Sequence, residues 1–520
     1  MGDNVFSPTR PPSRPGPPRK WIAAAAAVVL VIALVLGVGA LRGDDAVTPP
    51  RAAECAPGIA RVDVVVNDTT MQRRKECVGV TDSHDFGSPA IRRLLPLLRK
   101  ENDHATQGGP GTYVTVAFLG PLTGEDPRIV HMLEGAVTGQ HRANQENLVG
   151  SRPRVRLVLA NTDSRQSSWR PVVATLKRMV GGGDHLAAVT GLGLSQKETL
   201  DTAHELSKVS MPMVGSVITA DTLNSTRVRG LVAVNPRTGE QVSVLRQYLR
   251  TVPAIRRIML VSSGDPDDLY TTSLVDAFKL HLGDYSDGSE YPFGPTPGDE
   301  FNTIVKNLCS QDGEPPDAVF YAGRARDLPT FVEYLAKRSC HPERITILSG
   351  SDAVRLTLDI PDNAKMGEYL TRAHNPISVI YAPLVEPSLL EDPPGRPGHD
   401  GENLKQNYAD FVRSYQQLGF HPGRLNSAWG IMAHDSVLLA VGAIRLVKNP
   451  QQGGLPLPAE VRNQLYLIST SATSVPGASG PLTISSAGDR KNVRLPVLQL
   501  VIGSTPKLLT PDLLSPKPAP

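Results

Sequence analysis

The stretch that decides the fold is LAAVTGLGLSQKETLDTAHELSKVSMPMVGSVITADTL, residues 186–223. Its short apolar runs contain β-branched residues and predict buried strands at 186–190 and 212–217. Between them, residues 196–208 carry apolar side chains at helical spacing. A strand, a helix and a second strand in this order form a βαβ unit, so the stretch predicts a parallel sheet covered by helices.

Ser195 lies where this helix is expected to begin, and Glu198 follows three residues later. That spacing predicts a capping box, in which the serine hydroxyl accepts from a first-turn amide and the glutamate reaches back. The start of a helix after a parallel strand also attracts anions, because unpaired amides and the helix dipole face it. Ser195 therefore either caps its helix or binds an anionic group. A dinucleotide-binding G-x-G-x-x-G motif begins at Gly191 and Gly193 but fails, because Gln196 replaces its third glycine.

The α/β pattern continues from Tyr113 along most of the chain. Strands are expected near 113–120, 154–162, 186–190, 212–217 and 230–235, with helices near 128–147, 168–180 and 196–208. A second series has strands near 256–262, 289–293, 317–322 and 344–349, with helices near 239–250, 269–282, 300–309 and 327–339. A second capping box, Thr238 to Gln241, is expected to begin the helix 239–250.

The N-terminal residues predict a membrane anchor. Residues 1–20 are polar, basic and rich in proline, whereas residues 21–41 contain no charge. As a helix rising ~1.5 Å per residue, this run spans about 32 Å, close to the ~30 Å hydrocarbon core of a bilayer. Basic residues precede the run, and Asp44 and Asp45 follow it. The N-terminus is therefore expected in the cytoplasm and the bulk of the chain outside the cell membrane.

Two alternatives to this anchor are open. A signal peptide with the small residues Val38-Gly39-Ala40 at its cleavage site would have an apolar region longer than usual. A lipoprotein would need a cysteine near the apolar run, and Cys55 lies well beyond it.

The chain contains four cysteines, Cys55, Cys77, Cys309 and Cys340. Outside the membrane such residues are typical of disulfides, and of the three possible pairings we expect the local one, Cys55–Cys77 and Cys309–Cys340. Residues 42–112 also contain a strand-like run and an apolar-periodic segment, but too few cysteines and histidines at suitable spacing for a metal site. We interpret them as a disulfide-stapled, membrane-proximal extracellular module.

Several functional classes are disfavoured by the sequence. Beyond residue 41 the chain has equal numbers of basic and acidic residues, which does not indicate a nucleic-acid-binding surface. Neither G-x-S-x-G nor G-x-x-x-x-G-K-[ST] occurs, and His434, Asp435 and Ser436 are consecutive, so they point in different directions on one helix. The acidic residues at 265–268 lack EF-hand spacing and are more typical of a helix cap. We expect neither an enzyme nor a cofactor or metal site.

Ten segments together carry a resemblance to a known family. They are YVTVAFLGPLTG (113–124), EGAVTGQHRANQ (134–145), VRLVLANTDS (155–164), AVTGLGLS (188–195), MPMVGSVITA (211–220), LVAVNPRTGEQ (231–241), RRIMLVSSGDPDDLY (256–270), DAVFYAG (317–323), AWGIMAHDSVLLAVGAIRLV (428–447) and SGPLTISSAGDR (479–490). In order and spacing they resemble the type I periplasmic binding proteins, specifically the branched-chain amino-acid-binding family of ABC transporters. The resemblance covers roughly the last four-fifths of the chain.

This resemblance implies an α/β fold of two lobes, each a parallel-sheet sandwich, joined by three crossovers. A transmembrane helix and the disulfide-stapled region would precede them. The expected parts are a disordered cytoplasmic tail (1–20), the transmembrane helix (21–41), the membrane-proximal module (42–112), lobe 1 (113–236), lobe 2 (237–376), a return to lobe 1 (377–475), C-terminal strands in lobe 2 (476–505) and a disordered tail (506–520).

The resemblance also implies a ligand cleft between the lobes. In the family, a serine after the third strand and a backbone-plus-threonine motif after the fourth hold the ligand's α-carboxylate. These positions correspond to Ser195 and to the run from Val217 to Thr219. An acidic residue of the second lobe meets the ligand's ammonium, and Asp352 stands there, one methylene shorter than the expected glutamate. For Thr219 and Asp352, a purely local role in a turn or cap is the alternative.

Three departures from the family bear on this cleft. Tyr270 is expected to line it, although Thr271 replaces the family's glycine. The loop after Gly124 is short, which alters the wall that normally covers the ligand. Arg324 and Arg326 stand where an aromatic residue often faces the ligand. Either they pair with acidic neighbours, or they make the cleft favour a more acidic ligand.

The resemblance therefore predicts an extracellular substrate-binding protein of an ABC importer. It would bind an amino acid or a similar small polar solute by hinge closure and deliver it to a permease. The alternative is a ligand-sensing ectodomain of the same fold that signals through a membrane partner. A third class is a ligand-free scaffold of the cell envelope, since a fold does not decide between these functions.

Overall fold

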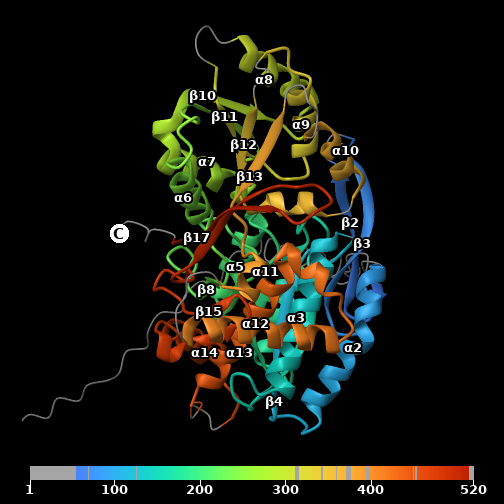
Figure 1. The fold of residues 1–520 in the computed structure, drawn as a ribbon. Coiled ribbons are helices and arrows are strands. Elements are labelled where there is room, and N and C mark those ends of the chain that lie inside the picture. Colours follow the sequence, from blue (N-terminus) through green and yellow to red (C-terminus); the bar gives the residue numbers. More distant parts are fainter. Residues whose placement is uncertain are drawn as a thin grey trace, which may run out of the picture. The chain divides into compact units, whose positions relative to one another are not determined.

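The computed structural model describes residues 54–67, 70–124, 126–310, 315–340, 344–358, 360–370, 376–393, 399–448, 450 and 454–514. The expected cytoplasmic tail and transmembrane helix, residues 1–41, lie outside this range. Within it the chain forms two α/β lobes, each built on one large sheet (Figure 1).

The first lobe contains an eight-stranded sheet with the order β1-β2-β3-β5-β4-β6-β7-β8. Its strands are β1 (Glu54–Ala56), β2 (Ile59–Asn67), β3 (Gln72–Thr81), β4 (Tyr113–Gly120), β5 (Arg154–Asn161), β6 (Leu186–Gly191), β7 (Met213–Gly215) and β8 (Leu231–Ala233). β4 to β8 pair in parallel, as the βαβ pattern predicts. They are almost entirely buried because helices cover both faces.

Alternate residues of these strands pack against different helices. Val116 and Phe118 face a core that includes α2 (Pro89–Thr106), α3 (Pro127–Gln145), α13 (Trp429–Leu446) and α14 (Pro458–Leu467). Ala117 and Leu119 face the core beneath α4 (Trp169–Val180) and α5 (Lys197–Ser207). This alternation follows from the period of two in a strand. α13 is apolar and long enough to cross a membrane, but it is a buried core helix of this lobe.

α3 and α13 approach each other closely at two glycines. A Cβ on Gly135 would lie 1.9 Å from the carbonyl oxygen of Gly430, which no side chain can tolerate. Glycine at this crossing therefore allows α3 and α13, both of which are mostly buried, to pack closely together.

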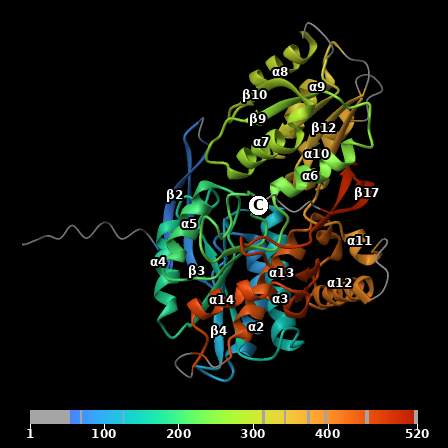
Figure 2. The same ribbon diagram turned by 90° about the vertical axis from the view of Figure 1, so that its left-hand side faces the viewer.

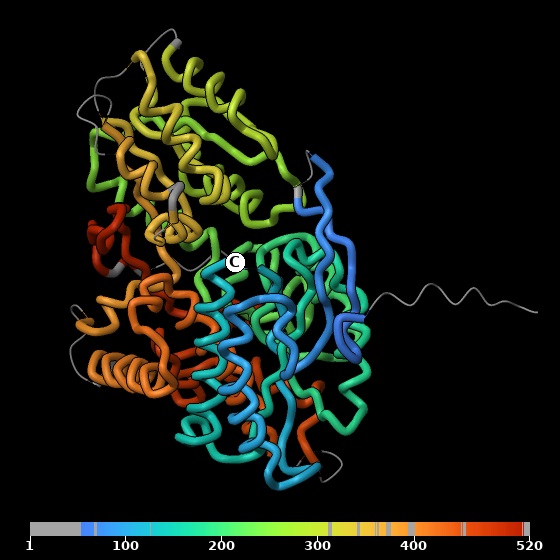
Figure 3. Tube along the Cα trace, turned by 90° about the vertical axis from the view of Figure 1, so that its right-hand side faces the viewer, coloured from blue at the N-terminus to red at the C-terminus, as the bar shows by residue number. Residues whose placement is uncertain are grey.

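Residues 54–106 are part of the first lobe, which corrects the prediction of a separate module at 42–112. β3 pairs antiparallel with β5, and the Asn102 side chain on α2 bonds both the amide and the carbonyl of Leu157 on β5. Figure 3 shows this N-terminal segment, in blue, lying against the cyan elements of the lobe. The physical reason is that α2 buries the apolar stripe Ile91, Leu94 and Leu98 in the lobe core, and β3 covers the open edge of β5.

The second lobe contains a seven-stranded sheet with the order β10-β9-β11-β12-β13-β16-β17. Its strands are β9 (Ile258–Ser263), β10 (Ser286–Phe293), β11 (Ala318–Ala322), β12 (Ile345–Ser349), β13 (Ile377–Tyr381), β16 (Arg494–Gln499) and β17 (Lys507–Leu514). One face packs on α6 (Thr238–Leu249) and α7 (Leu269–Leu282), and the other on α8 (Gly298–Ser310), α9 (Leu328–Ala336) and α10 (Pro361–Leu370) (Figure 2).

The C-terminal third of the chain departs from the prediction in three places. β13 pairs with β12, so the chain returns to the first lobe after residue 381 and not at 377. The segment 476–505 was expected to form strands of the second lobe. Instead, β14 (Val475–Gly477) and β15 (Gly480–Leu482) form a separate two-stranded sheet that contacts α12 (His399–Gln417) and α13 of the first lobe. β17 occupies part of the expected disordered tail 506–520, because Leu509 and Leu513 pack against the core of the second lobe.

Both predicted disulfides are present. Cys55–Cys77 joins β1 to β3, and Cys309–Cys340 joins the end of α8 to the segment after α9. Each bond therefore links neighbouring elements of a single lobe.

Replacing both Cys55 and Cys77 with serine should lower the free energy of unfolding by about 3 kcal/mol, because the bond restricts the unfolded chain. The two residues are 22 positions apart, and the Cys309–Cys340 bond remains in the variant. Urea unfolding of the oxidised proteins measures the difference. An unchanged transition midpoint would contradict the prediction.

Candidate functional site

Ser195 lies in the loop after β6, at the edge of the first sheet where the parallel strands end. Its side chain is buried, and its hydroxyl accepts a hydrogen bond from the Ala220 amide at 3.1 Å. α5 begins at Lys197 and its N-cap is Gln196, so the predicted capping box of Ser195 and Glu198 is wrong. The reason is a tertiary contact: the loop after β7 brings the Ala220 amide to the hydroxyl. Ser195 thus points toward the loop 217–220, as the cleft interpretation requires.

The main chain of Ser195 contacts the second lobe directly. Its carbonyl oxygen accepts from the Tyr270 amide and from Arg324 Nη2, both at 3.2 Å. Next to it, the Lys197 amide donates to the Asp267 carbonyl at 2.9 Å. The starts of α5 in one lobe and α7 in the other therefore lie against each other at Ser195.

Arg324 is held at this junction by Asp268. Its Nε and Nη2 donate to the two carboxylate oxygens at 2.6 and 2.7 Å, and its guanidinium lies 4.7 Å from the centre of the Tyr270 ring. Burial acts to lower the pKa of Arg324, but Asp268 outweighs it and the net pKa is raised. Asp268 also caps α7 by accepting from the amides of Tyr270 and Thr271, as expected of the acidic run 265–268. Of the two interpretations of Arg324, the contacts support pairing with an acidic neighbour.

Asp352 lies in the first turn of a 3-10 helix, Ser351–Thr357, that follows β12. Its amide donates to the Tyr270 hydroxyl at 3.1 Å, and burial raises the pKa of that hydroxyl. Its carboxylate accepts from the Ala325 amide at 2.9 Å and lies 3.9 Å from Arg128 Nη1. Asp352 therefore has partners in both lobes.

Sequence reasoning missed a second group of charges across the lobes. Arg355 Nη1 of the second lobe donates to both oxygens of Asp126 in the first lobe at 3.1 Å. Arg128 also binds Asp126, at 3.0 Å, and its guanidinium lies 5.8 Å from the centre of the Trp429 ring. Burial acts to raise the pKa of Asp126, but the two guanidinium groups outweigh it and the pKa is lowered. The only sequence signal was the short charged loop after Gly124, where Asp126 and Arg128 stand.

The remaining predicted residues are Thr219, Val217 and Arg326, and they lie in different surroundings. Thr219 is buried next to the Ser195 partner Ala220, and its carbonyl accepts from the Thr238 amide at 2.9 Å. Val217 is half-buried and packs against the large apolar core. Arg326 points away, since its side chain is 63% exposed and pairs with Asp327 at 3.4 Å. The structure thus brings Ser195, Thr219, Tyr270, Arg324 and Asp352 together and leaves Arg326 outside.

A group of charged residues lies beside this site where the chain first crosses between lobes; Arg237 is buried, and Asp221, Glu240 and Asp489 are half-buried. Asp221 accepts from the Gly239 amide with both oxygens, at 3.2 and 3.1 Å, and Arg237 Nε donates to Asp489 at 2.6 Å. Glu240 accepts from the Arg237 amide at 2.7 Å. α6 therefore begins at Thr238 with Glu240 reaching back, and the predicted capping box of Thr238 and Gln241 is wrong. Burial raises the pKa of Asp221 to about 6 and that of Glu240 to about 7.

Comparison with known proteins identifies the fold. Neither the models of known protein families nor the curated protein sequences match this chain. Among solved structures, an ABC transporter substrate-binding protein from Desulfitobacterium hafniense in complex with Leu matches with a TM-score of 0.56 and 15% identity, over 76% of this chain and all of that one. This chain has the type I periplasmic-binding-protein fold.

Two further structures share this fold. LivJ, the branched-chain amino acid transporter substrate-binding protein of Streptococcus pneumoniae in complex with isoleucine, matches with a TM-score of 0.54 and 14% identity, over 76% of this chain and 99% of its own. A solute-binding protein of an ABC transporter from Rhodopseudomonas palustris, in complex with 3,4-dihydroxybenzoic acid, gives 0.54 and 13%, over 78% and 98%. Both of these neighbours are solute-binding proteins of ABC transporters.

The charged group at the first crossing predicts that this binding-protein fold loses stability as the pH rises. The folded-state pKa values of Asp221, about 6, and of Glu240, about 7, lie above the ordinary values of 3.8 and 4.5 for these carboxyl groups. The folded protein therefore binds more protons than the unfolded chain, and this contribution is present below about pH 4 and lost as the pH rises through 7. It amounts to at most about 3 kcal/mol for each group.

The check is urea unfolding at pH 5 and pH 8 of the wild type and of the Asp221→Asn, Glu240→Gln double variant. The double variant should lose less stability between the two pH values. Glu402→Gln, at an exposed carboxylate on α12, serves as the control and should follow the wild type. An equal pH dependence in the wild type and the double variant would contradict the prediction.

Proposed function

We propose that this chain is an extracellular substrate-binding protein of an ABC importer, anchored in the cell membrane by residues 21–41 with its N-terminus in the cytoplasm. Its ligand would be an amino acid or a similar small polar solute, bound between the lobes. The observation that carries the proposal is the junction at Ser195. Tyr270 and Arg324 of the second lobe bind the Ser195 carbonyl, and Asp352 binds the Tyr270 hydroxyl, while the Ser195 hydroxyl faces the loop 217–220 of the first lobe.

A protein that opens about a hinge would break the contacts at this junction, and the groups set free could then bind a ligand. When the lobes separate, the carbonyl of Ser195 loses two donors, and Arg324 and the Tyr270 amide lose an acceptor. A ligand carboxylate entering there can accept from the Ser195 hydroxyl and from amides of the loop 217–220. Ligand contacts with both lobes would then favour the closed form, which a permease recognises.

The charges at the junction bear on the class of ligand. Asp352, the expected partner of a ligand ammonium, already faces Arg128 and the Ala325 amide. The solved neighbours include complexes with amino acids and with an aromatic acid that lacks an amine. Acids with and without an α-ammonium therefore belong in the same ligand screen. The alternative, a ligand-sensing ectodomain, would use the same site and differ in its membrane partner.

A thermal-shift screen of the full chain against amino acids and matched amine-free acids, such as leucine and 4-methylpentanoate, identifies the ligand. Ser195→Ala should then weaken its binding about 10- to 100-fold, because a hydrogen bond to a charged group contributes about 1.5–3 kcal/mol. The variant should also lose about 1 kcal/mol of folding stability in the ligand-free protein, since the bond with Ala220 is removed. Asp352→Asn should weaken an amine-bearing ligand more than its amine-free analogue.

Calorimetric titration of both variants provides the comparison, with Arg326→Gln as the matched control. Arg326 lies in the same loop as Arg324 but is exposed and outside the junction, so this variant should bind like the wild type. Wild-type affinity in both Ser195→Ala and Asp352→Asn would show that the ligand binds elsewhere. A screen without any stabilising compound would contradict the proposed function itself.

A further inference from the structure

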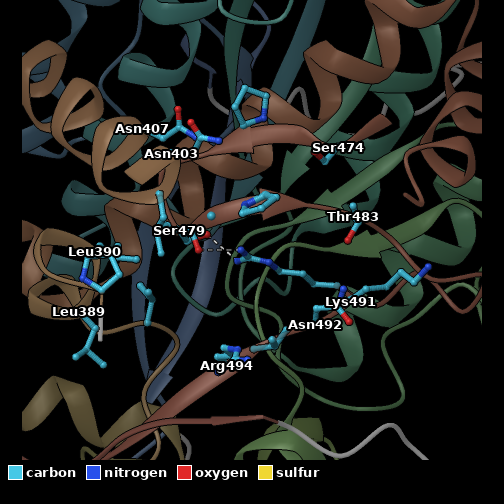
Figure 4. Close-up of a pocket in the computed structure, with 18 of the residues that line it drawn as sticks. Leu389, Leu390, Asn403, Asn407, Ser474, Ser479, Thr483, Lys491, Asn492 and Arg494 are labelled. Carbon is cyan, nitrogen blue, oxygen red and sulfur yellow. Dashed lines mark hydrogen bonds between the residues drawn. The ribbon is translucent and has the colours of Figure 1, made fainter. Parts of the chain in front are cut away.

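A cavity of about 1030 Å³ lies away from the Ser195 junction and shares no residue with it. It is bounded by α11 (Pro387–Glu391), α12, the loop 469–474, the β14–β15 hairpin and residues 490–496 (Figure 4). We call it the hinge cavity. Small-molecule sites typically occupy about 300–1,000 Å³, so this cavity is large enough for a ligand.

The charged residues that line the hinge cavity are mostly cations. Arg490, Lys491 and Arg494 line it, whereas Glu386 is the one carboxylate among its lining residues. Glu386 already accepts from the hydroxyl and the amide of Ser388, at 2.9 and 3.3 Å. The excess of positive charge therefore favours an anionic occupant.

Arg490 is fixed in this cavity by hydrogen bonds to the chain, and its charge also acts on the buried carboxylate of Asp435. Its guanidinium donates to the Ser479 hydroxyl at 2.7 Å, to the Ser479 carbonyl at 2.9 Å and to the Val234 carbonyl at 3.1 Å. Ser479 is in turn anchored by the buried Asp435, which accepts from its amide at 3.0 Å and from its hydroxyl. Figure 4 shows Ser479 in the cavity wall, with dashed lines beside it that mark hydrogen bonds. A positive group is thus held in place before any ligand binds.

Uncharged polar groups complete the lining. Asn403 and Asn407 lie one helical turn apart on α12 and side by side in Figure 4, and both line the cavity. Neither side-chain amide makes a hydrogen bond with any other residue that the structure describes. Asn492 and Thr483 add further donors and acceptors on the opposite wall. An amide offers two donors and an acceptor oxygen, which suits the hydroxyl groups of a ligand.

The cavity also touches two of the three crossings between the lobes, and one of its lining residues bonds to the third. Leu384 to Glu386 follow β13 on the way to the first lobe, and Asn492 to Arg494 lead into β16 of the second. The third crossing, between β8 and α6, is reached through the bond from Arg490 to the Val234 carbonyl. An occupant of the cavity would therefore contact or restrain the segments about which the lobes rotate.

We propose that the hinge cavity is a second ligand site, which binds a small hydroxylated anion such as a sugar acid or a sugar phosphate. The carboxylate or phosphate is held by the cationic wall, and the hydroxyl groups are held by the asparagine pair on α12. Because the site contacts the crossings, its occupancy reduces their motion and restricts the angle between the lobes. By linkage, a change of that angle alters the affinity of the cavity in return.

The test is calorimetric titration of the full chain in detergent with gluconate, glucose 6-phosphate and sorbitol. Gluconate or glucose 6-phosphate should bind saturably, and whichever binds more tightly identifies the anionic group. Sorbitol, which has the hydroxyl groups without the charge, should bind at least 10-fold more weakly. The Lys491→Glu, Arg494→Glu double variant should weaken the anion at least 10-fold. Asn403→Ala with Asn407→Ala should weaken both anions about 10-fold.

Lys405→Glu is the matched control, because Lys405 is exposed on α12 and does not line the cavity. It should bind the anion like the wild type. Saturation by neither anion, equal binding of sorbitol, or unchanged affinity in the Lys491→Glu, Arg494→Glu variant would overturn the site. Amide hydrogen exchange of residues 234–237, 382–386 and 492–496 should slow at saturation. Unchanged exchange there would overturn the link between the cavity and the hinge.

Discussion

The buried guanidinium of Arg324 connects the two lobes at the point where both present the start of a helix. It is paired with Asp268 through two hydrogen bonds and donates a third to the Ser195 carbonyl. Removing one partner of such a buried pair typically costs about 3–5 kcal/mol, because the other charge is left without compensation. Asp268 also caps α7, and the Tyr270 ring lies under the guanidinium. This ion pair therefore orients the start of α7 and holds the guanidinium that binds the Ser195 carbonyl of the first lobe.

The core of the fold could be predicted because its signal is local. Apolar runs rich in β-branched residues identified β4, β5 and β6, and alternating helices completed the parallel sheets. Elements that join a sheet at its edge were assigned wrongly. β3 adds antiparallel to β5 through a long-range pairing, and β17 lies in the proline-rich C-terminal segment, whose composition favoured disorder. Nothing in the local pattern of either strand shows which neighbour it will find.

The candidate site, like the fold, could be predicted only in part. Ser195, Tyr270 and Asp352 could be placed because the family resemblance implied that residues after these strands of the two sheets line the cleft. The bonds they make could not, because the Ala220 amide and Arg128 approach from distant parts of the chain. The pair of Asp126 and Arg355 is separated by 229 residues, so charge pattern alone gave no indication that the two meet. The hinge cavity was missed for a related reason, since its walls come from segments with no shared motif.

If Arg324 holds the lobes together at the Ser195 junction, its replacement should change the distance between them, and that distance is the most direct test. All four native cysteines are paired, so spin labels can be attached at Lys405→Cys in the first lobe and Leu280→Cys in the second, both exposed positions. Electron paramagnetic resonance of the labelled protein should give one narrow distribution of distances between the two labels. In the labelled Arg324→Gln variant, the distribution should be broader and extend to longer distances. Arg326→Gln should leave the distribution unchanged. The same narrow distribution in a folded Arg324→Gln variant would contradict the account.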